Sequence, residues 1–298
     1  KGIRAVSPAS ILGSKLIGLK PEIPYDTIHL TLAVMLGKDK LNIFIQFRQT
    51  IKGGNMSFKC KIGLHSWKGC KCSDCDKIRD EQHDWSKNFE KCSICGITRN
   101  SGSFIDDRDN NIYNWVKIGD QIWMCENLKA STFLNGDEIP YISKGDEWNR
   151  AGGSGQPAMS YYGHEPVSIK NSRVYYNWHA INDSRFIAPR GWHVPTDEEW
   201  STLINYLGGD KVAGIKMKSK KGWDGNGNGT NESGFNATPT GYRTFLGSFD
   251  EIGTKAFWWS STGNSSDAWG RVVKYNTAQV VREYAIVNHG FSIRCVKD

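Results

Sequence analysis

Apolar residues after position 197 recur with the spacing of a helix that buries one side. The recurring positions are Trp200, Leu203, Ile204 and Leu207, followed by Gly208-Gly209. Just ahead, Thr196 and Glu199 have the spacing of a capping box, and acidic residues occupy the first turn, where the helix dipole favours them. This pattern predicts a helix over residues 197–207 that packs on a sheet.

Aromatic and β-branched residues predict short strands on both sides of this helix. Residues 112–118 and 121–128 are separated by Gly119-Asp120, which is typical of a hairpin with a two-residue turn. Further strands are predicted at residues 159–162, 173–178, 257–261, 268–275, 279–286 and 290–296. Alternation along residues 268–275 places Trp269, Arg271, Val273 and Tyr275 on one face. Short strands, one main helix and long loops indicate the α+β class.

Composition agrees with a loop-rich domain held together by aromatic residues. The chain has 298 residues, 32 glycines and 12 tryptophans, ten of which lie after residue 105. This length fits one domain of ordinary size plus an accessory module. No apolar run approaches the roughly 20 residues needed to span a membrane.

The positive charge of the chain is concentrated near its N-terminal end. The formal net charge is +7, and residues 1–55 contain eight Lys or Arg and three acidic residues, a net +5. The other 243 residues carry 30 basic and 28 acidic side chains, a net +2. The main body therefore gives no electrostatic indication of a nucleic-acid partner.

Residues 1–55 differ from the rest of the chain. They lack the basic start, continuous apolar core and small-residue cleavage site of a secretory signal. Lys52-Gly53-Gly54 can be encoded by a purine-rich ribosome-binding sequence, a few nucleotides ahead of the Met56 codon. We expect translation to start at Met56, with residues 1–55 an untranslated or disordered leader. The alternative is a genuine N-terminal extension.

Residues 56–100, hereafter the Cys/His module, contain six of the eight cysteines and an internal repeat. Each copy has a His-x-Trp, then a Cys-x-x-Cys, then an arginine. The Cys pairs and the arginines are offset by 20 residues, and the His-x-Trp by 18. Two Cys-x-x-Cys pairs separated by 16 residues have the spacing of a zinc ribbon, in which four thiolates complete a closed tetrahedron.

We expect a structural zinc ion in this module, because a segment so small cannot bury a core and metal would supply its folding free energy. The first-choice ligands are Cys72, Cys75, Cys92 and Cys95. The further candidates are His83 and Cys60, which together with His65 and Cys70 suffice for a second or rearranged site. The alternative is a disulfide knot, which needs an oxidising compartment. Residues 101–104 are predicted to be a polar linker.

The glycine-rich stretch 222–235 is a weaker metal candidate. Asp224, Asn226 and Asn228 match the first half of a calcium loop. Phe235 stands where that loop needs its bidentate acid. The alternative is a connection that uses Asn and Gly for positive φ.

No catalytic set is evident in the sequence. It contains no nucleophile elbow, zinc-protease motif, phosphate-binding loop or dinucleotide fingerprint. The acidic residues at 197–199 are explained by helix-start electrostatics. We therefore do not expect an enzyme.

The motifs around the predicted helix resemble those of a known family. The stretch Gly191 to Trp200, GWHVPTDEEW, is similar to the signature of the Fibrobacter succinogenes major paralogous domain. Other motifs of the family follow in order over about residues 105–298. They include Ile118-Gly119-Asp120-Gln121-Ile122-Trp123, Tyr176-Asn177-Trp178, Gly241-Tyr242-Arg243, Phe257-Trp258-Trp259 and Gly290-Phe291-Ser292-Ile293-Arg294-Cys295.

The resemblance implies a C-type-lectin-like fold, related to formylglycine-generating-enzyme-like domains. That enzyme activity depends on metal-binding cysteines, whereas this domain has only Cys125 and Cys295. Many relatives pair the last cysteine with one ahead of the signature. Ala188 stands at that position here, so Cys125 replaces the partner or Cys295 stays free. Loss of the pair implies a reducing compartment, so we expect a cytoplasmic location, although most relatives are surface or secreted proteins.

The segment 258–296 also resembles the variable region of proteins that are diversified by retroelements. The framework would be Phe257, Trp258, Trp259, Trp269, Arg271, Val280, Arg282, Gly290, Phe291 and Arg294. The ten candidate ligand-binding residues are Asn264, Ser265, Ser266, Asp267, Tyr275, Asn276, Thr277, Tyr284, Asn288 and His289. Their types can be written by changing adenines in an asparagine codon, and they suit a binding surface. The alternative is ordinary turn composition.

Together these patterns predict a zinc-ribbon-like module at residues 56–100 and a C-type-lectin-like domain at 105–298. The predicted function is non-catalytic recognition of an unknown protein or glycan ligand. The alternative is a carbohydrate-binding or cell-envelope-associated domain of fixed specificity.

Overall fold

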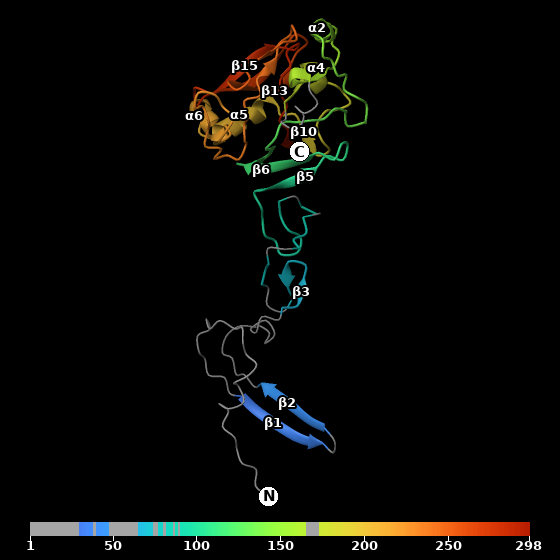
Figure 1. Cartoon of the computed structure of the whole chain (residues 1–298), viewed down its shortest axis with the longest axis vertical. Coiled ribbons are helices and arrows are strands. Elements are labelled where there is room, and N and C mark those ends of the chain that lie inside the picture. Colours follow the sequence, from blue (N-terminus) through green and yellow to red (C-terminus); the bar gives the residue numbers. More distant parts are fainter. Residues whose placement is uncertain are drawn as a thin grey trace. The chain divides into compact units, whose positions relative to one another are not determined.

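The computed structural model describes residues 30–37, 40–47, 65–73, 77–79, 82–85, 87–88, 90–164 and 173–298. These residues belong to two compact units, 1–82 and 83–298 (Figure 1). The boundary between the units falls inside the Cys/His module. No helix among the described residues is long and apolar enough to cross a membrane.

The described residues of the first unit form two hairpins. β1 (Leu30–Gly37) pairs with β2 (Lys40–Phe47), within the segment predicted to be a leader. Whether that segment is translated stays a prediction. β3 (Trp67–Lys68) pairs with β4 (Lys71–Cys72) in the first copy of the Cys/His repeat.

A five-stranded sheet in the second unit has the order β10-β16-β7-β6-β5. Its strands are β5 (Ser101–Ile105), β6 (Ile112–Ile118), β7 (Gln121–Met124), β10 (Trp192–His193) and β16 (Val296–Lys297). The predicted hairpin is confirmed, because Ile118 pairs with Gln121 across Gly119-Asp120. The predicted linker 101–104 instead forms most of β5, which pairs with β6.

The second main sheet has three antiparallel strands in the order β13-β14-β15. They are β13 (Lys255–Gly263), β14 (Asp267–Lys274) and β15 (Val280–Ile286). Two small pairs complete the strands, β8 (Met159–Tyr161) with β9 (Val174–Tyr176) and β11 (Tyr242–Arg243) with β12 (Phe249–Asp250). These small antiparallel sheets and few helices confirm the mixed α and β composition that the sequence predicted.

The helices of the second unit are short. Those among the described residues are α2 (Gly145–Gly153), the 3-10 turn η2 (Tyr162–His164), α4 (Trp178–Ile181), α5 (Asp197–Tyr206) and α6 (Asp210–Met217). The predicted helix is confirmed in α5, whose capping box joins Thr196 and Glu199. Trp200, Leu203 and Ile204 form its buried side. The sequence reading missed α2, α4 and α6.

The three-stranded sheet separates two hydrophobic cores, because successive side chains of a strand point to opposite faces. On β13, Phe257 and Trp259 belong to one core, while Ala256 and Trp258 belong to the other. The second core also contains the buried side chains of α5 and α6. The sheet is therefore covered on one face by these helices.

Asp197 ties the start of α5 to this sheet. Its carboxylate accepts a hydrogen bond of 2.7 Å from buried Arg271 on β14 and one of 3.0 Å from Arg282 on β15. Burial works to raise the pKa of Asp197, but its hydrogen bonds to Arg282 and Arg271 outweigh this and lower the pKa. Arg271, Val273 and Tyr275 thus lie on the helix side of β14, as the alternation predicted.

The predicted strand at 290–296 is not continuous. Only Val296–Lys297 belongs to a sheet, as β16. Earlier residues of the segment make isolated bridges, Gly290 with Arg243, Phe291 with Tyr176 and Ser292 with Trp258. The segment therefore crosses between elements instead of extending one sheet.

Candidate binding surface and metal centre

The turn between β13 and β14 carries four of the candidate ligand-binding residues. The Asn264 side-chain carbonyl accepts hydrogen bonds from the amides of Ser266 (2.9 Å) and Asp267 (3.0 Å). Such an Asx turn fixes the loop backbone. The Asn264 amide donates a hydrogen bond of 2.7 Å to the Tyr284 hydroxyl on β15. Side chains from the turn and the neighbouring strand therefore form one polar surface.

Tyr284 is the large side chain of this surface, with 46% of its area exposed. Its ring lies 4.5 Å from that of Trp269 on β14. The Arg282 guanidinium lies 3.2 Å from the centre of the same Trp269 ring and is itself held by Asp197. The stack gives Tyr284 a fixed support that reaches back to α5.

A cavity of about 420 Å³ opens beside this turn. Asn264 and Ser265 line it together with glycines at the end of α2 and with His179 from α4. The His179 Nε2 lies 2.9 Å from the Gly152 carbonyl oxygen. Burial lowers the pKa of His179, although this carbonyl opposes the shift. The wall of the cavity is therefore polar and fixed in place, and His179 is uncharged at neutral pH.

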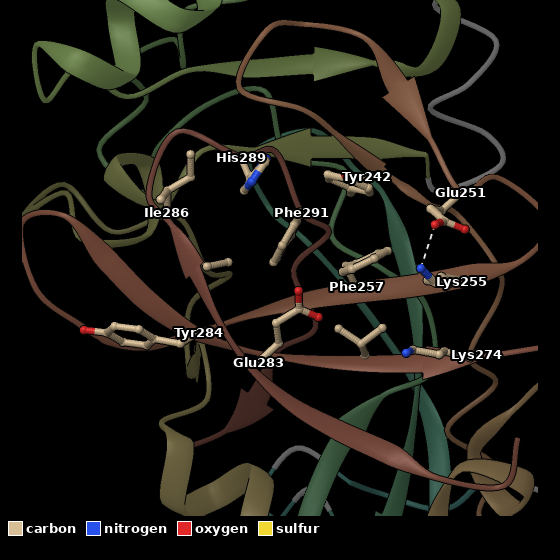
Figure 2. Close-up of a pocket in the computed structure, with 12 residues that line it drawn as sticks. Tyr242, Glu251, Lys255, Phe257, Lys274, Glu283, Tyr284, Ile286, His289 and Phe291 are labelled. Carbon is tan, nitrogen blue, oxygen red and sulfur yellow. Dashed lines mark hydrogen bonds and ion pairs between the residues drawn. The ribbon is translucent and has the colours of Figure 1, made fainter.

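A second cavity, of about 360 Å³, lies on the face of the three-stranded sheet that α5 and α6 do not cover (Figure 2). Its apolar lining consists of Phe257, Val272, Ala285, Ile286 and Phe291. Its polar and aromatic lining consists of Tyr242, Glu251, Lys255, Lys274, Glu283, Tyr284 and His289. Both cavities fall in the size range of small-ligand sites.

Charges of both signs surround this second cavity. Glu251 and Lys255 pair with each other at 2.6 Å, and the bonds that Lys255 and Thr254 donate lower the pKa of Glu251. The rings of Tyr242, Phe257 and Phe291 form an aromatic floor in this cavity. Figure 2 shows Glu283 next to this floor and Lys274 on the neighbouring strand. A ligand there would meet an aromatic surface with charged groups at its edge.

His289 lies above that aromatic floor. Its ring is stacked with Phe291 and lies edge-on to Tyr242. Burial lowers the pKa of His289, so the imidazole is neutral at pH 7. Its buried Nδ1 makes no hydrogen bond within the described part of the chain.

The remaining candidate residues lie elsewhere. Tyr275 and Thr277 are in the turn at the opposite end of β14, where both carbonyls accept hydrogen bonds of 3.0 Å from Lys218. Asn276 is exposed in the same turn. Asn288 lies against α2, because its carbonyl accepts a 2.8 Å hydrogen bond from Trp148. The ten residues thus divide among four places instead of forming one patch.

The calcium candidates lie in an ordered glycine-rich loop. The Asn228 side-chain oxygen accepts a hydrogen bond of 3.1 Å from the Trp223 amide. The Asp224 amide donates to the Gly253 carbonyl at 2.9 Å, and Asn226 adopts positive φ. These contacts account for the Asn and Gly residues without an ion, and calcium stays a prediction.

A group of cysteine and histidine side chains in the Cys/His module could hold a metal ion. The ligand atoms of His83, Cys92 and Cys95 lie within 4.8 Å of one another. Cys95 Sγ is 3.3 Å from His83 Nδ1, and the Asp84 amide donates to Cys92 Sγ at 3.4 Å.

The electrostatics of the group favour a thiolate. Burial works to raise the pKa of Cys92, but hydrogen bonds from the backbone of Cys95, Ile94 and Asp84 and from His83 lower it to about 5. A thiolate at neutral pH is the form that binds metal. The group therefore offers a metal ion both sulfur and nitrogen ligands.

Three of the predicted ligands, Cys92, Cys95 and His83, lie together in this group. Cys75 and Cys60 lie outside the described residues. A backbone hydrogen bond holds His83 next to the second Cys-x-x-Cys. The Ser93 amide donates to the Asp84 carbonyl at 2.8 Å, which keeps the Cys-x-x-Cys close to the His-x-Trp.

Comparison with known families assigns most of the larger unit to one family. Residues 116–297 match the sequence model of the Fibrobacter succinogenes major domain. The chain belongs to this family. No curated protein and no solved structure matches the chain.

In the Fibrobacter succinogenes major domain of this chain, Cys125 and Cys295 are free thiols. Burial raises the pKa of Cys125 to about 11 and that of Cys295 to about 12. Both are therefore protonated at neutral pH. The sequence left open whether Cys125 pairs with Cys295 or Cys295 stays free. The structure shows both cysteines unpaired.

The sequence reading of the major domain missed several residues that line the cavities. The sequence predicts Lys274 and Glu283 to lie in strands without assigning them to a site. It gives Tyr242 only as part of a family motif. Strand alternation could have found the first two, because they share the Val272 and Ala285 face of the sheet. His179 gives no such signal, since α4 was not predicted.

Proposed function

We propose that the Fibrobacter succinogenes major domain of this chain is a non-catalytic recognition domain with a C-type-lectin-like fold. Its ligand is a protein or a glycan. The binding surface is formed by the β13–β14 turn, Tyr284 and the two adjoining cavities. The Cys/His module acts as a stabilising cap or adaptor.

The observation that carries this proposal is how burial divides the residues of segment 257–294. None of the ten candidate ligand-binding residues is buried. Eight of the ten framework residues are buried, the exceptions being half-buried Trp269 and exposed Arg282. The exceptions form the stack that supports Tyr284. A binding domain that varies its contacts needs this arrangement, a fixed interior beneath exposed polar and aromatic positions.

The chemistry of the exposed positions supports recognition. Tyrosine supplies contact area at low entropic cost, and Asn and Ser adapt their hydrogen bonds. The charged groups of Lys274 and Glu283 add polar contacts around the aromatic residues that line the second cavity. Such sites bind by orientation and complementarity, with no need for a nucleophile or a general base.

Two forms of this function differ in whether the ligand is fixed. In the first, the ten positions are diversified by a retroelement and the ligand changes between copies of the gene. In the second, the domain has one carbohydrate or cell-envelope ligand. Calcium-dependent sugar binding through Asp224, Asn226 and Asn228 would favour the second form, and chelation at neutral pH would then abolish binding.

Sequencing of codons 256–298 across a population of the source organism separates the two forms. If the segment is diversified, substitutions will concentrate at adenines in the ten candidate codons and spare buried framework codons such as those of Trp258 and Arg294. A near-copy of the segment will lie nearby in the genome. An invariant segment without such a copy would exclude diversification and leave the fixed ligand.

For the metal we propose zinc with a structural role. The group of His83, Cys92 and Cys95 offers the nitrogen and sulfur ligands that structural zinc sites use. Two free cysteines in the major domain and a cysteine-rich module favour a reducing compartment.

A further inference from the structure

The two copies of the Cys/His repeat have the same internal geometry. In the first copy the rings of His65 and Trp67 are 5.1 Å apart and inclined by 45°. In the second copy His83 and Trp85 are 5.2 Å apart and inclined by 42°. The histidine that belongs to the metal group therefore has a counterpart held in the same way by its tryptophan.

The arginine that follows each Cys pair repeats its contact as well. The Arg79 guanidinium lies 4.9 Å from the centre of the Trp67 ring. The Arg99 guanidinium lies 4.4 Å from the centre of the Trp85 ring. Each copy thus closes with a cation over the tryptophan that supports its histidine.

The backbone hydrogen bonds that shape the Cys-x-x-Cys turn recur one by one. The Cys72 amide donates to the Lys77 carbonyl at 2.9 Å, and the Cys92 amide donates to the Ile97 carbonyl at 2.9 Å. The bond that brings the histidine close also recurs. It joins the Ser73 amide to the Ser66 carbonyl (3.0 Å) in the first copy and Ser93 to Asp84 (2.8 Å) in the second.

We infer that the first copy of the repeat carries a second metal site. His65 and Cys72 are its ligands, in the roles of His83 and Cys92. The Cys-x-x-Cys that begins at Cys72 is offset by 20 residues from the one that begins at Cys92. This inference rests on the proposal that the second copy binds zinc.

One position that differs between the copies indicates where the repeat ends. Cys70, two residues before the first Cys-x-x-Cys, corresponds to Glu90 in the second copy. Both carbonyls receive the amide of the following arginine, from Arg79 at 3.0 Å and from Arg99 at 2.8 Å. The Glu90 carboxylate pairs with Lys117 of β6 at 2.5 Å. The position of a thiol in the first copy is therefore occupied in the second copy by a carboxylate that pairs with the major domain. That domain comes directly after the second copy in the sequence.

Native mass spectrometry of the full chain, purified with zinc, tests the inference by counting ions. We expect two zinc ions per chain, one in Cys72→Ser, one in Cys92→Ser and two in the control Cys125→Ser, whose thiol lies outside the module. One ion in the wild type, retained in Cys72→Ser and lost in Cys92→Ser, would overturn the second site and leave the first. No zinc in the wild type would overturn both.

A titration of the metal-free wild-type chain covers the case in which Cys72→Ser unfolds both copies. Two equivalents of zinc taken up before saturation support the second site. Saturation at one equivalent contradicts it, whatever the variants do.

Discussion

Removing zinc from the full chain is expected to unfold the Cys/His module and to leave the major domain folded. The described part of the module has only cysteines, Cys70, Cys72 and Cys92, among its buried apolar residues. Zinc binding contributes about 10–16 kcal/mol to the folding of small zinc-dependent peptides. Without the ion, the turn that joins Ser93 to Asp84 has no comparable source of stability.

Hydrogen exchange measured by mass spectrometry checks this result. With zinc bound, the amides of Cys92, Ser93 and Gly96 should be protected, since each donates a backbone hydrogen bond. After chelation they should exchange rapidly, while amides of α5 keep their protection. Cys92→Ser should reproduce the effect of chelation. Unchanged protection of Ser93 after chelation would show that the module folds without metal.

Replacing Asp197 by alanine is expected to cost about 3–5 kcal/mol of unfolding free energy, the range for removing one partner of a buried ion pair. Arg271 is almost wholly buried, and Asp197 is its only carboxylate partner among the described ion pairs. The substitution leaves that cation uncompensated and also releases Arg282 from its support. Urea denaturation of the wild type and the variant measures the difference.

Glu198→Ala is the matched control for this experiment. Glu198 is exposed in the same first turn of α5 and shares the favourable interaction with the helix dipole, worth about 0.3–1 kcal/mol. The double variant D197A/R271M should recover part of the loss, because it also removes the buried charge. Equal costs for Asp197→Ala and Glu198→Ala would contradict the role given to the ion pair.

The same ion pair gives stability a defined dependence on pH. The pKa of Asp197 is lowered in the folded state, so its contribution is present above the unfolded value of about 3.9. It is lost as pH falls through the lowered folded pKa. In Asp197→Asn this part of the acid dependence should disappear.

The elements that the sequence predicted correctly depend on neighbouring residues. Thr196 and Glu199 cap α5 within one turn, and Gly119-Asp120 closes the β6–β7 hairpin. These signals are complete within a few positions of the chain. The helix α2 lacks them, because it begins and ends in glycine and is fixed by Trp148, which packs under the buried Arg243.

The parts that could not be predicted depend on distant partners. Residues 290–296 have the composition of a strand, but their bridges go to Arg243, Tyr176 and Trp258, each from a different element. Spacing likewise predicted Cys92 and Cys95 as metal ligands, but spacing alone does not bring His83 next to Cys95. In the binding surface, alternation predicted which residues face α5, whereas the cavity beside Asn264 depends on the end of α2.

The most direct test of recognition by this surface compares two double variants on an array of glycans and proteins. N264A/Y284A removes the contact pair of the surface, and N205A/Y206A makes the same changes at exposed positions of α5. The account predicts at least about tenfold weaker binding of wild-type ligands by N264A/Y284A, since truncating an anchoring tyrosine costs about 2 kcal/mol. It predicts unchanged binding by N205A/Y206A and urea stability close to wild type in both. Wild-type affinity in N264A/Y284A, or an equal loss in N205A/Y206A, would contradict recognition through this surface.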